Sequence, residues 1–258
     1  MKIRFAKYQG TGNDFIIINN ISNSFPKDNN DLIAMLCDRK FGIGADGLIL
    51  IEKNHKLDFE MKYFNSDGHI GSMCGNGARC SIHYSFINKL IKSVTHFYAC
   101  DGKHRGEINN NIVKVSINDV SKHKYYDDFI FVNTGSPHLV KVVDDVNAVD
   151  LIKQSRIIRK KNIFKDGVNI NYLHKLKNNK YMIRTYERGV ENETLSCGTG
   201  AVASAIVLNI LSLLNTEKVI LQTKGGDLTV NFKNTNETFS EIYLSGEVVK
   251  VFDGKLEI

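Results

Sequence analysis

The chain has 258 residues, of which 42% are hydrophobic and 24% are charged, enough for one large domain or two small ones with separate cores. Its apolar stretch over 201–214 is interrupted by polar residues and is shorter than the roughly 20 residues that a bilayer span needs, so we expect no membrane partner. A net charge of +6 does not by itself require an anionic partner such as a nucleic acid. Without the apolar run of a secretory signal, the chain is expected to be cytoplasmic, with its 5 cysteines reduced.

Hydrophobic periodicity predicts both strands and helices in the first half of the chain. In chain order, we predict an extended segment that ends at Thr11-Gly12, a helix over 31–39, strands over 48–51 and 59–64, and a helix over 78–90 that follows the turn Cys74-Gly75-Asn76-Gly77.

The second half predicts the same order of elements. After Thr134-Gly135 we predict a helix over 149–159, strands over 168–173 and 181–186, and a helix over 201–214 that follows the turn Cys197-Gly198-Thr199-Gly200. The last segment, 247–258, lies beyond this pattern and is predicted to be a hairpin that crosses back to the first half.

The two halves resemble each other at a nearly constant offset. An offset of 123 positions relates Thr11-Gly12 to Thr134-Gly135, Cys74 to Cys197 and Gly102 to Gly225, and one of 120 relates Asp46-Gly47 to Asp166-Gly167. Such an offset indicates an internal duplication. We therefore predict the α+β class with two pseudo-symmetric lobes, each a β-sheet or barrel wrapped around a central helix. The lobes are expected to span 1–119, joined by 247–258, and 120–246, with the active site in the cleft between them.

Both Cys-Gly-x-Gly turns are expected to place a cysteine at the N-terminus of a helix. Unpaired N-H groups and the positive end of the helix dipole favour an anion at such a position, and they lower the pKa of a thiol. Glycine lets the backbone approach a ligand closely. A pseudo-two-fold axis would place Cys74 and Cys197 on opposite walls of one cleft. Inversion of a carbon centre needs this geometry, because one thiolate removes a proton from one face and the opposite thiol returns a proton to the other.

Seven ordered motifs together resemble the diaminopimelate epimerase family. They are Gly10-Thr11-Gly12-Asn13-Asp14-Phe15, Phe64-Asn65-Ser66-Asp67-Gly68, Met73-Cys74-Gly75-Asn76-Gly77-Ala78-Arg79-Cys80, Gly135-Ser136-Pro137-His138, Gly167-Val168-Asn169, Tyr186-Glu187-Arg188-Gly189 and Ser196-Cys197-Gly198-Thr199-Gly200. The resemblance covers essentially the whole chain. It implies a cofactor-independent isomerase that interconverts LL- and meso-diaminopimelate in lysine and peptidoglycan precursor biosynthesis, usually as a homodimer.

The resemblance also assigns roles to individual residues. Cys74 and Cys197 match the catalytic pair, while His138 and Glu187 match residues that tune their protonation. The matching substrate-binding residues are Asn13, Asn65, Gly75, Asn76, Ser136, Asn169, Glu187, Arg188, Gly198 and Thr199. The chain departs from the commonest family pattern at two of its positions. Ser136 replaces an asparagine, and Gly47 stands where some members carry glutamine.

Other functions remain as alternatives. Ser136 motivates a two-cysteine racemase or epimerase of the same fold for another amino acid. The basic stretch 156–165 motivates a nucleic-acid-binding module, although acidic residues flank it and favour a solvated surface. A dithiol redox protein is disfavoured because the Cys-x-x-Cys spacing is missing.

The remaining cysteines and glycines predict no second site. Cys37, Cys80 and Cys100 have no counterparts at the repeat offset and are expected to be core residues. The spacing of Cys74 and Cys80 does not fit a zinc site, so no metal is expected. The sequence Gly42-Ile43-Gly44-Ala45-Asp46-Gly47 follows a predicted helix and enters a strand, the reverse of the order in a dinucleotide-binding turn.

Overall fold

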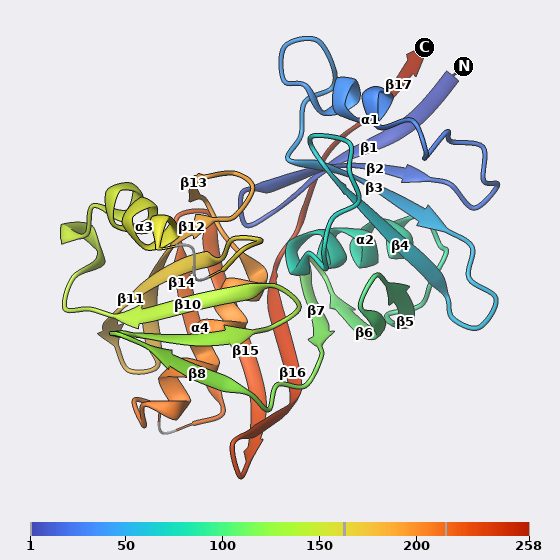
Figure 1. Ribbon diagram of the computed structural model, residues 1–258. Helices are drawn as coiled ribbons and strands as arrows, with labels where there is room; N and C mark the ends of the chain where they lie inside the picture. Colours follow the sequence, from blue (N-terminus) through green and yellow to red (C-terminus); the bar gives the residue numbers. More distant parts are fainter. Residues whose placement is uncertain (1, 162–163, 215, 258) are drawn as a thin grey trace. The chain divides into compact units, whose positions relative to one another are not determined.

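The computed structural model describes residues 2–161, 164–214 and 216–257 (Figure 1). The chain divides into two compact units. Unit 1 comprises Met1–Val115 with Gly246–Ile258, and unit 2 comprises Ser116–Ser245. The repeat places the corresponding boundaries at 119/120 and 246/247, a few residues further along the chain. In the described ranges, no helix is both long and apolar enough to span a bilayer.

Unit 1 contains most of its strands in chain order and recruits the last strand from the C-terminus (Figure 1). Its elements are β1 (Lys2–Gly10), β2 (Asn13–Asn19), α1 (Asn30–Cys37), β3 (Gly47–Glu52), β4 (Phe59–Asn65), α2 (Gly75–Ile87), β5 (Val94–Ala99), β6 (Gly102–Asn109), β7 (Ile112–Ile117), which continues past the boundary, and β17 (Val249–Glu257).

Unit 2 repeats this order with its own edge strands. Its elements are β8 (His123–Tyr126), β9 (Phe129–Asn133), β10 (Pro137–Val142), the 3-10 helix η1 (Val146–Ala148), α3 (Leu151–Lys160), β11 (Asn169–Lys177), β12 (Lys180–Glu187), β13 (Asn192–Thr194), α4 (Gly198–Ile210), β14 (Lys218–Thr223), β15 (Gly226–Thr235) and β16 (Thr238–Glu247), which continues past the boundary.

The strand pairings confirm the internal duplication. In unit 1, β1 and β2 are antiparallel, β2 and β3 are parallel across α1, β3 and β4 are antiparallel, and β4 and β5 are parallel across α2. In unit 2, β9 and β10, β10 and β11, β11 and β12, and β12 and β14 repeat these four relations around α3 and α4. A parallel pair needs a crossover, and helices provide it at the same places in both units.

Each unit folds its strands around one buried helix. Helix α2 is buried from Gly75 to Ser85 and contacts β1, β2, β3, β4 and β6. Helix α4 is buried from Gly198 to Leu208 and contacts β9, β10, β11 and β15. A helix that is buried on all sides needs neighbours on all sides, and in both units strands supply them. The expected α+β fold with a central helix in each lobe is therefore confirmed.

The structure corrects the boundaries of both central helices. They begin at Gly75 and Gly198 rather than at 78 and 201, and they end at Ile87 and Ile210 rather than at 90 and 214. Cys74 and Cys197 have extended backbone angles and are the N-cap residues. The glycine-containing turns are thus the first helical turns, because the backbone enters the helix directly after the cap.

Two equivalences inferred from the repeat are also wrong. Hairpin register pairs Gly102 with Ala99 and Gly226 with Thr223, so the partner of Gly102 is Gly226 and not Gly225. Both glycines have positive φ, 127° and 136°, where a side chain would be strained. A short sequence pattern cannot resolve the one-residue difference, because glycine stands at both 225 and 226.

The second wrong equivalence concerns Gly47. Register pairs Phe15 with Gly47 in unit 1 and His138 with Asn169 in unit 2, so Gly47 corresponds to Asn169 and not to Gly167. The C-terminal segment also differs from expectation. It is the single strand β17, antiparallel to β1, rather than a hairpin. Pairing with β1 satisfies the backbone groups on the β17 edge that faces β1, so the segment forms a strand without folding back on itself.

Candidate functional site

Cys74 lies at the N-terminus of α2 in a polar cluster of unit 1. Its Sγ atom accepts a hydrogen bond from the Gly77 N-H at 3.4 Å and donates to Asn13 Oδ1 at 3.7 Å. Asn76 Nδ2 also donates to Asn13 Oδ1, at 3.3 Å. The structure therefore brings together the predicted site residues Asn13, Cys74 and Asn76, together with Gly75 in the same helical turn.

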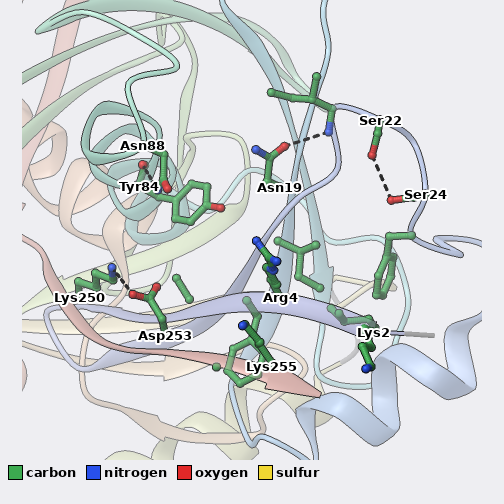
Figure 2. Close-up of a pocket in the computed structure, with 17 residues that line it drawn as sticks. Lys2, Arg4, Asn19, Ser22, Ser24, Tyr84, Asn88, Lys250, Asp253 and Lys255 are labelled. Atoms are coloured by element: carbon green, nitrogen blue, oxygen red, sulfur yellow. Dashed lines mark hydrogen bonds and ion pairs between the residues drawn. The ribbon is translucent and has the colours of Figure 1, made fainter. Parts of the chain in front are cut away.

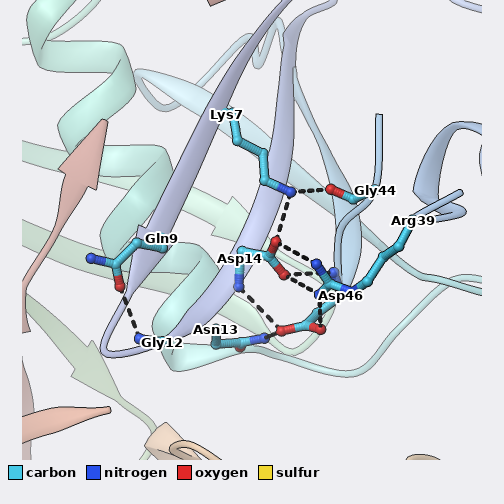
Figure 3. Close-up of polar contacts among 8 residues, drawn as sticks. All are labelled: Lys7, Gln9, Gly12, Asn13, Asp14, Arg39, Gly44 and Asp46. Atoms are coloured by element: carbon cyan, nitrogen blue, oxygen red, sulfur yellow. Dashed lines mark hydrogen bonds and ion pairs between the residues drawn. The ribbon is translucent and has the colours of Figure 1, made fainter. Parts of the chain in front are cut away.

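A hydrogen bond to Asp46 connects Asn13 to a network of ion pairs (Figure 3). Asn13 Nδ2 donates to Asp46 Oδ2 at 2.6 Å, and Arg39 Nη2 bridges Asp46 and Asp14 at 2.7 Å each. Lys7, which is almost fully buried, pairs with Asp14 at 2.7 Å. Burial works to raise the pKa of Asp14, but hydrogen bonds from Arg39 and Lys7 outweigh it and lower that pKa to about 2. This network was not predicted from the sequence, in which the acidic residues Asp14 and Asp46 were the available signal.

Asn65 and Gly47 lie opposite each other on neighbouring strands. A Cβ atom on Gly47 would lie 2.4 Å from the Phe64 carbonyl oxygen and 2.5 Å from the Tyr63 ring. In this chain, position 47 leaves no room for a side chain. Backbone and ring atoms occupy the space of a side chain. Asn65 ends β4 and is exposed.

Cys197 occupies the equivalent N-cap position in unit 2, where its side chain is buried. Its Sγ atom lies 3.5 Å from Thr199 Oγ1, and Thr199 Oγ1 lies 3.0 Å from His138 Nε2. The structure therefore places the predicted residues His138, Cys197 and Thr199 in one chain of contacts. Gly198 lies between Cys197 and Thr199 in the first turn of α4.

His138 is fully buried, and burial together with the positive charge of Arg188 lowers its pKa to about 3. The imidazole is therefore neutral at physiological pH. Its Nδ1 atom lies 3.1 Å from Asn171 Nδ2. Asn171 was not predicted as a site residue from the sequence, although it is a polar residue within the largely apolar strand predicted over 168–173.

The other predicted site residues of unit 2 lie in or beside a second group of polar contacts in that unit. Asn169 Nδ2 donates to Ser136 Oγ at 2.9 Å, and the backbone N-H of Arg188 donates to Asn169 Oδ1 at 2.9 Å. The Arg188 guanidinium donates to the Asp166 carbonyl at 3.2 Å. Glu187, next to Arg188, ends β12 and is half-buried.

The other cysteines differ from the N-cap pair. Burial raises the pKa of the Cys37 thiol to about 12 and raises that of Cys80 further. Cys37 and Cys80 are core residues, as expected. Cys100 is exposed, which contradicts the expectation that it lies in the core. It occupies the turn between β5 and β6. Within the described ranges, no cluster of three or more His, Cys, Asp or Glu residues could hold a metal ion.

A separate hollow of about 1150 Å³ lies in unit 1 between β1, β2 and β17 (Figure 2). Its lining includes Arg4, Tyr84, Lys255 and the ion pair between Lys250 and Asp253. No predicted site residue lines it. The hollow is therefore distinct from the clusters around Cys74 and Cys197.

Part of the basic stretch 156–165 is already paired in unit 2. Arg159 contacts Glu191 at 2.6 Å, and Lys161 contacts Asp127 at 2.8 Å. Residues 162–163 of this stretch lie outside the described residues.

Comparison with known proteins decides the family. The profile of the diaminopimelate epimerase family matches the chain twice, over residues 5–126 and 130–251. The chain belongs to the diaminopimelate epimerase family. It is 45% identical to a diaminopimelate epimerase of Flavobacterium psychrophilum, with 97% of this chain and 99% of the relative covered. It is 38% identical to a diaminopimelate epimerase of Aquifex aeolicus, with 98% of each chain covered.

Solved structures confirm the fold of this diaminopimelate epimerase family member. A phenazine biosynthesis protein of the PhzF family from Bacillus anthracis superposes with a TM-score of 0.78 at 13% identity, covering 100% of both chains. A hydroxyproline epimerase from Agrobacterium vitis superposes with a TM-score of 0.76 at 11% identity, covering 99% of this chain and 92% of that one. At such low identities the likeness concerns the fold alone.

Proposed function

We propose that this member of an isomerase family epimerises LL-diaminopimelate to meso-diaminopimelate without a cofactor, using Cys74 and Cys197 as its acid and base. The observation that carries the proposal is the presence of a cysteine as N-cap of the buried central helix in both units. Family membership over the full length supports the substrate. Helix N-termini favour thiolate formation, which a cysteine needs in order to act as a base.

The proposed reaction moves two protons through two sulfur atoms. One cysteine, as a thiolate, takes the α-proton, and the electron pair of the broken C-H bond passes to the α-carbon and its carboxylate. The other cysteine, as a thiol, gives its proton to the opposite face of the carbanion. The first sulfur ends as a thiol and the second as a thiolate, so the reverse reaction starts from the exchanged pair.

First-turn backbone N-H groups are proposed to hold the α-carboxylate. The helices supply no internal acceptor for these groups at Gly75, Asn76, Gly198 and Thr199. They would also stabilise the negative charge that builds up on the carboxylate during proton transfer. Glu187 is proposed to bind the α-ammonium group and, with His138, to tune cysteine protonation.

The second stereocentre of diaminopimelate carries its own carboxylate and ammonium groups. We assign its recognition to Asn13, Asn65, Ser136, Asn169 and Arg188. Arg188 suits a carboxylate because its guanidinium donates two parallel hydrogen bonds. Amide side chains both donate and accept, so they suit a zwitterionic group.

The cellular role is part of the proposal. A cytoplasmic homodimer is proposed to work in lysine and peptidoglycan precursor biosynthesis. Sedimentation of the purified protein tests the dimer, which a purely monomeric species at micromolar concentration would contradict.

The experiment incubates the reduced protein with LL-diaminopimelate in deuterated water and follows α-deuterium and meso product by NMR. We expect deuterium uptake together with conversion, and loss of conversion in Cys74→Ala and Cys197→Ala. Cys100→Ala is the matched control, because Cys100 is an exposed turn residue and its replacement leaves conversion intact. Normal conversion in either N-cap variant would rule out the two-cysteine mechanism.

Ser136 favours one alternative substrate class. A serine hydroxyl is shorter than the asparagine amide of the common family pattern and offers fewer hydrogen bonds. A panel of single-centre amino acids in the same assay tests this alternative. Faster conversion of any of them than of diaminopimelate would replace the proposed substrate.

A further inference from the structure

At equivalent strand positions near the two N-cap cysteines, the two units carry side chains of different chemical types. Phe15 and His138 are equivalent, because each pairs with the first residue of the next parallel strand. The same registers make Ile49 equivalent to Asn171 and, across the following hairpin, Tyr63 equivalent to Thr185. Unit 1 thus packs a ring, an aliphatic chain and a second ring where unit 2 has an imidazole, an amide and a hydroxyl.

The unit 2 residues form a hydrogen-bonded chain whose direction is fixed at one end. Asn171 Nδ2 donates to the Leu139 backbone carbonyl at 3.1 Å, and a carbonyl oxygen only accepts. Thr185 Oγ1 donates to Asn171 Oδ1 at 2.9 Å, in agreement with this orientation of the amide. The second hydrogen of Nδ2 then points to His138 Nδ1 at 3.1 Å.

This orientation determines the tautomer of His138. A nitrogen that accepts a hydrogen bond carries no proton, so the proton of the neutral ring is on Nε2. That N-H donates to Thr199 Oγ1 at 3.0 Å. The hydroxyl keeps its own hydrogen to donate, and Cys197 Sγ lies 3.5 Å from Thr199 Oγ1.

Cys74 has a different partner in unit 1. Asp46 accepts from Asn13 Nδ2 and so turns Asn13 Oδ1, an acceptor, toward Cys74 Sγ. An acceptor favours the protonated thiol, whereas a donor favours the thiolate. Gly77 contributes an N-H to Cys74 in either state.

We propose that Asn171 is a positioning residue that holds His138 in the Nε2-protonated form, so that Thr199 donates to Cys197. In the substrate-free enzyme, Cys197 is then the thiolate and Cys74 is the thiol. The inference rests on the proposed function only in treating these two cysteines as the acid and base. It deepens that function by assigning which of them removes the first proton.

Local packing supports a fixed place for the amide. Asn171 is fully buried, and a Cβ atom on Gly200 would lie 2.6 Å from its Oδ1 atom. Burial lowers the pKa of His138 most, and the positive charge of Arg188 adds to this effect by disfavouring the imidazolium. The ring therefore acts as a neutral donor and acceptor rather than as a cation.

The first test needs no substitution. Long-range 1H–15N NMR spectra of the substrate-free protein distinguish a protonated from an unprotonated ring nitrogen. We expect His138 to be protonated on Nε2 and bare on Nδ1. A proton on Nδ1 would overturn the proposal.

The second test measures the rate at which iodoacetamide alkylates Cys197, resolved by peptide mass spectrometry. Measured at a pH below the pKa of the Cys197 thiol, where one pKa unit changes the thiolate fraction tenfold, Asn171→Leu should slow this rate about tenfold. Thr185→Val is the matched control. It removes the hydroxyl behind the amide but keeps the Leu139 contact that orients Asn171, so the rate should stay within about twofold.

Thr199 provides a pair of variants that does not depend on the folding of Asn171→Leu. Thr199→Val should slow alkylation of Cys197, and Thr199→Ser should restore the rate because it restores the hydroxyl. An unchanged rate in folded Thr199→Val would overturn the proposal. All of these readouts use substrate-free protein. If they succeed while diaminopimelate is not converted, the proposed function fails and this inference stands.

Discussion

Equivalent glycines in the two central helices provide a matched pair of substitutions. Gly77 and Gly200 are both the third helical residue after the N-cap cysteine. A Cβ atom on Gly77 would lie 3.1 Å from the Ile49 terminal methyl carbon, the flexible end of an apolar side chain. A Cβ atom on Gly200 would lie 2.6 Å from Asn171 Oδ1, and three hydrogen-bond partners hold that amide in place.

These distances predict opposite outcomes for the same change. Alanine favours a helix over glycine by at most about 1 kcal/mol, and this gain should be similar at the two equivalent positions. In Gly77→Ala the methyl carbon of Ile49 yields, so stability should be nearly unchanged or slightly higher. In Gly200→Ala the amide must move, and overpacking of this kind costs about 1–3 kcal/mol. We therefore expect Gly200→Ala to be less stable than Gly77→Ala by about 1–2 kcal/mol.

Amide hydrogen exchange of helices α2 and α4 measures the local opening free energy of each unit without assuming two-state unfolding of the whole chain. Epimerase activity is measured in parallel. Gly200→Ala should also slow alkylation of Cys197, because the displaced amide no longer orients His138. If exchange in α4 of Gly200→Ala were as slow as in the wild type, the proposed rigidity of Asn171 would be wrong.

Three further predictions concern the charged and titratable groups. Asp46→Ala should lower kcat/KM by about tenfold while secondary structure by circular dichroism is retained, because Asn13 loses the contact that orients its amide; unchanged kinetics would refute this role. Because the folded-state pKa of Asp14 is depressed to about 2, Asp14 contributes about 2 kcal/mol that is present above its unfolded pKa and lost as pH falls toward 2. Asp14→Asn should therefore weaken the pH dependence of the denaturation midpoint below pH 4, and an unaltered pH dependence would contradict the ion pairs of Asp14. The folded-state pKa of His138 is also lowered, to about 3, so between pH 6.5 and 3 the unfolded chain binds this proton and the folded chain does not. The free energy of unfolding therefore decreases as the pH is lowered through that range. His138→Phe should remove this part of the pH dependence, and persistence of the full dependence would assign it to other groups.

Much of the fold follows from local patterns in the sequence. Strands β3, β4, β11 and β12 and helices α1 and α3 lie within a few residues of their predicted positions, because apolar periodicity marks the face or segment that must be buried. The duplication is visible because turns that need glycine recur at a fixed offset. The predicted starts of α2 and α4 were wrong by three residues, because the low helix propensity of glycine favours a loop at these positions.

The family, the duplicated α+β fold and the two candidate cysteines could be predicted from the sequence, because repeated motifs and hydrophobic spacing are properties of neighbouring residues in the chain. The polar residues that surround each cysteine became visible only in the folded molecule. Asn171 and Thr185 are separated from Cys197 along the chain, and strand register and helix packing bring them into one hydrogen-bonded chain. The ion pairs of Lys7, Asp14, Arg39 and Asp46 arise in the same way from three separate segments. Hydrogen-bond direction depends on which atoms face each other, and this is a property of packing that residue spacing does not encode.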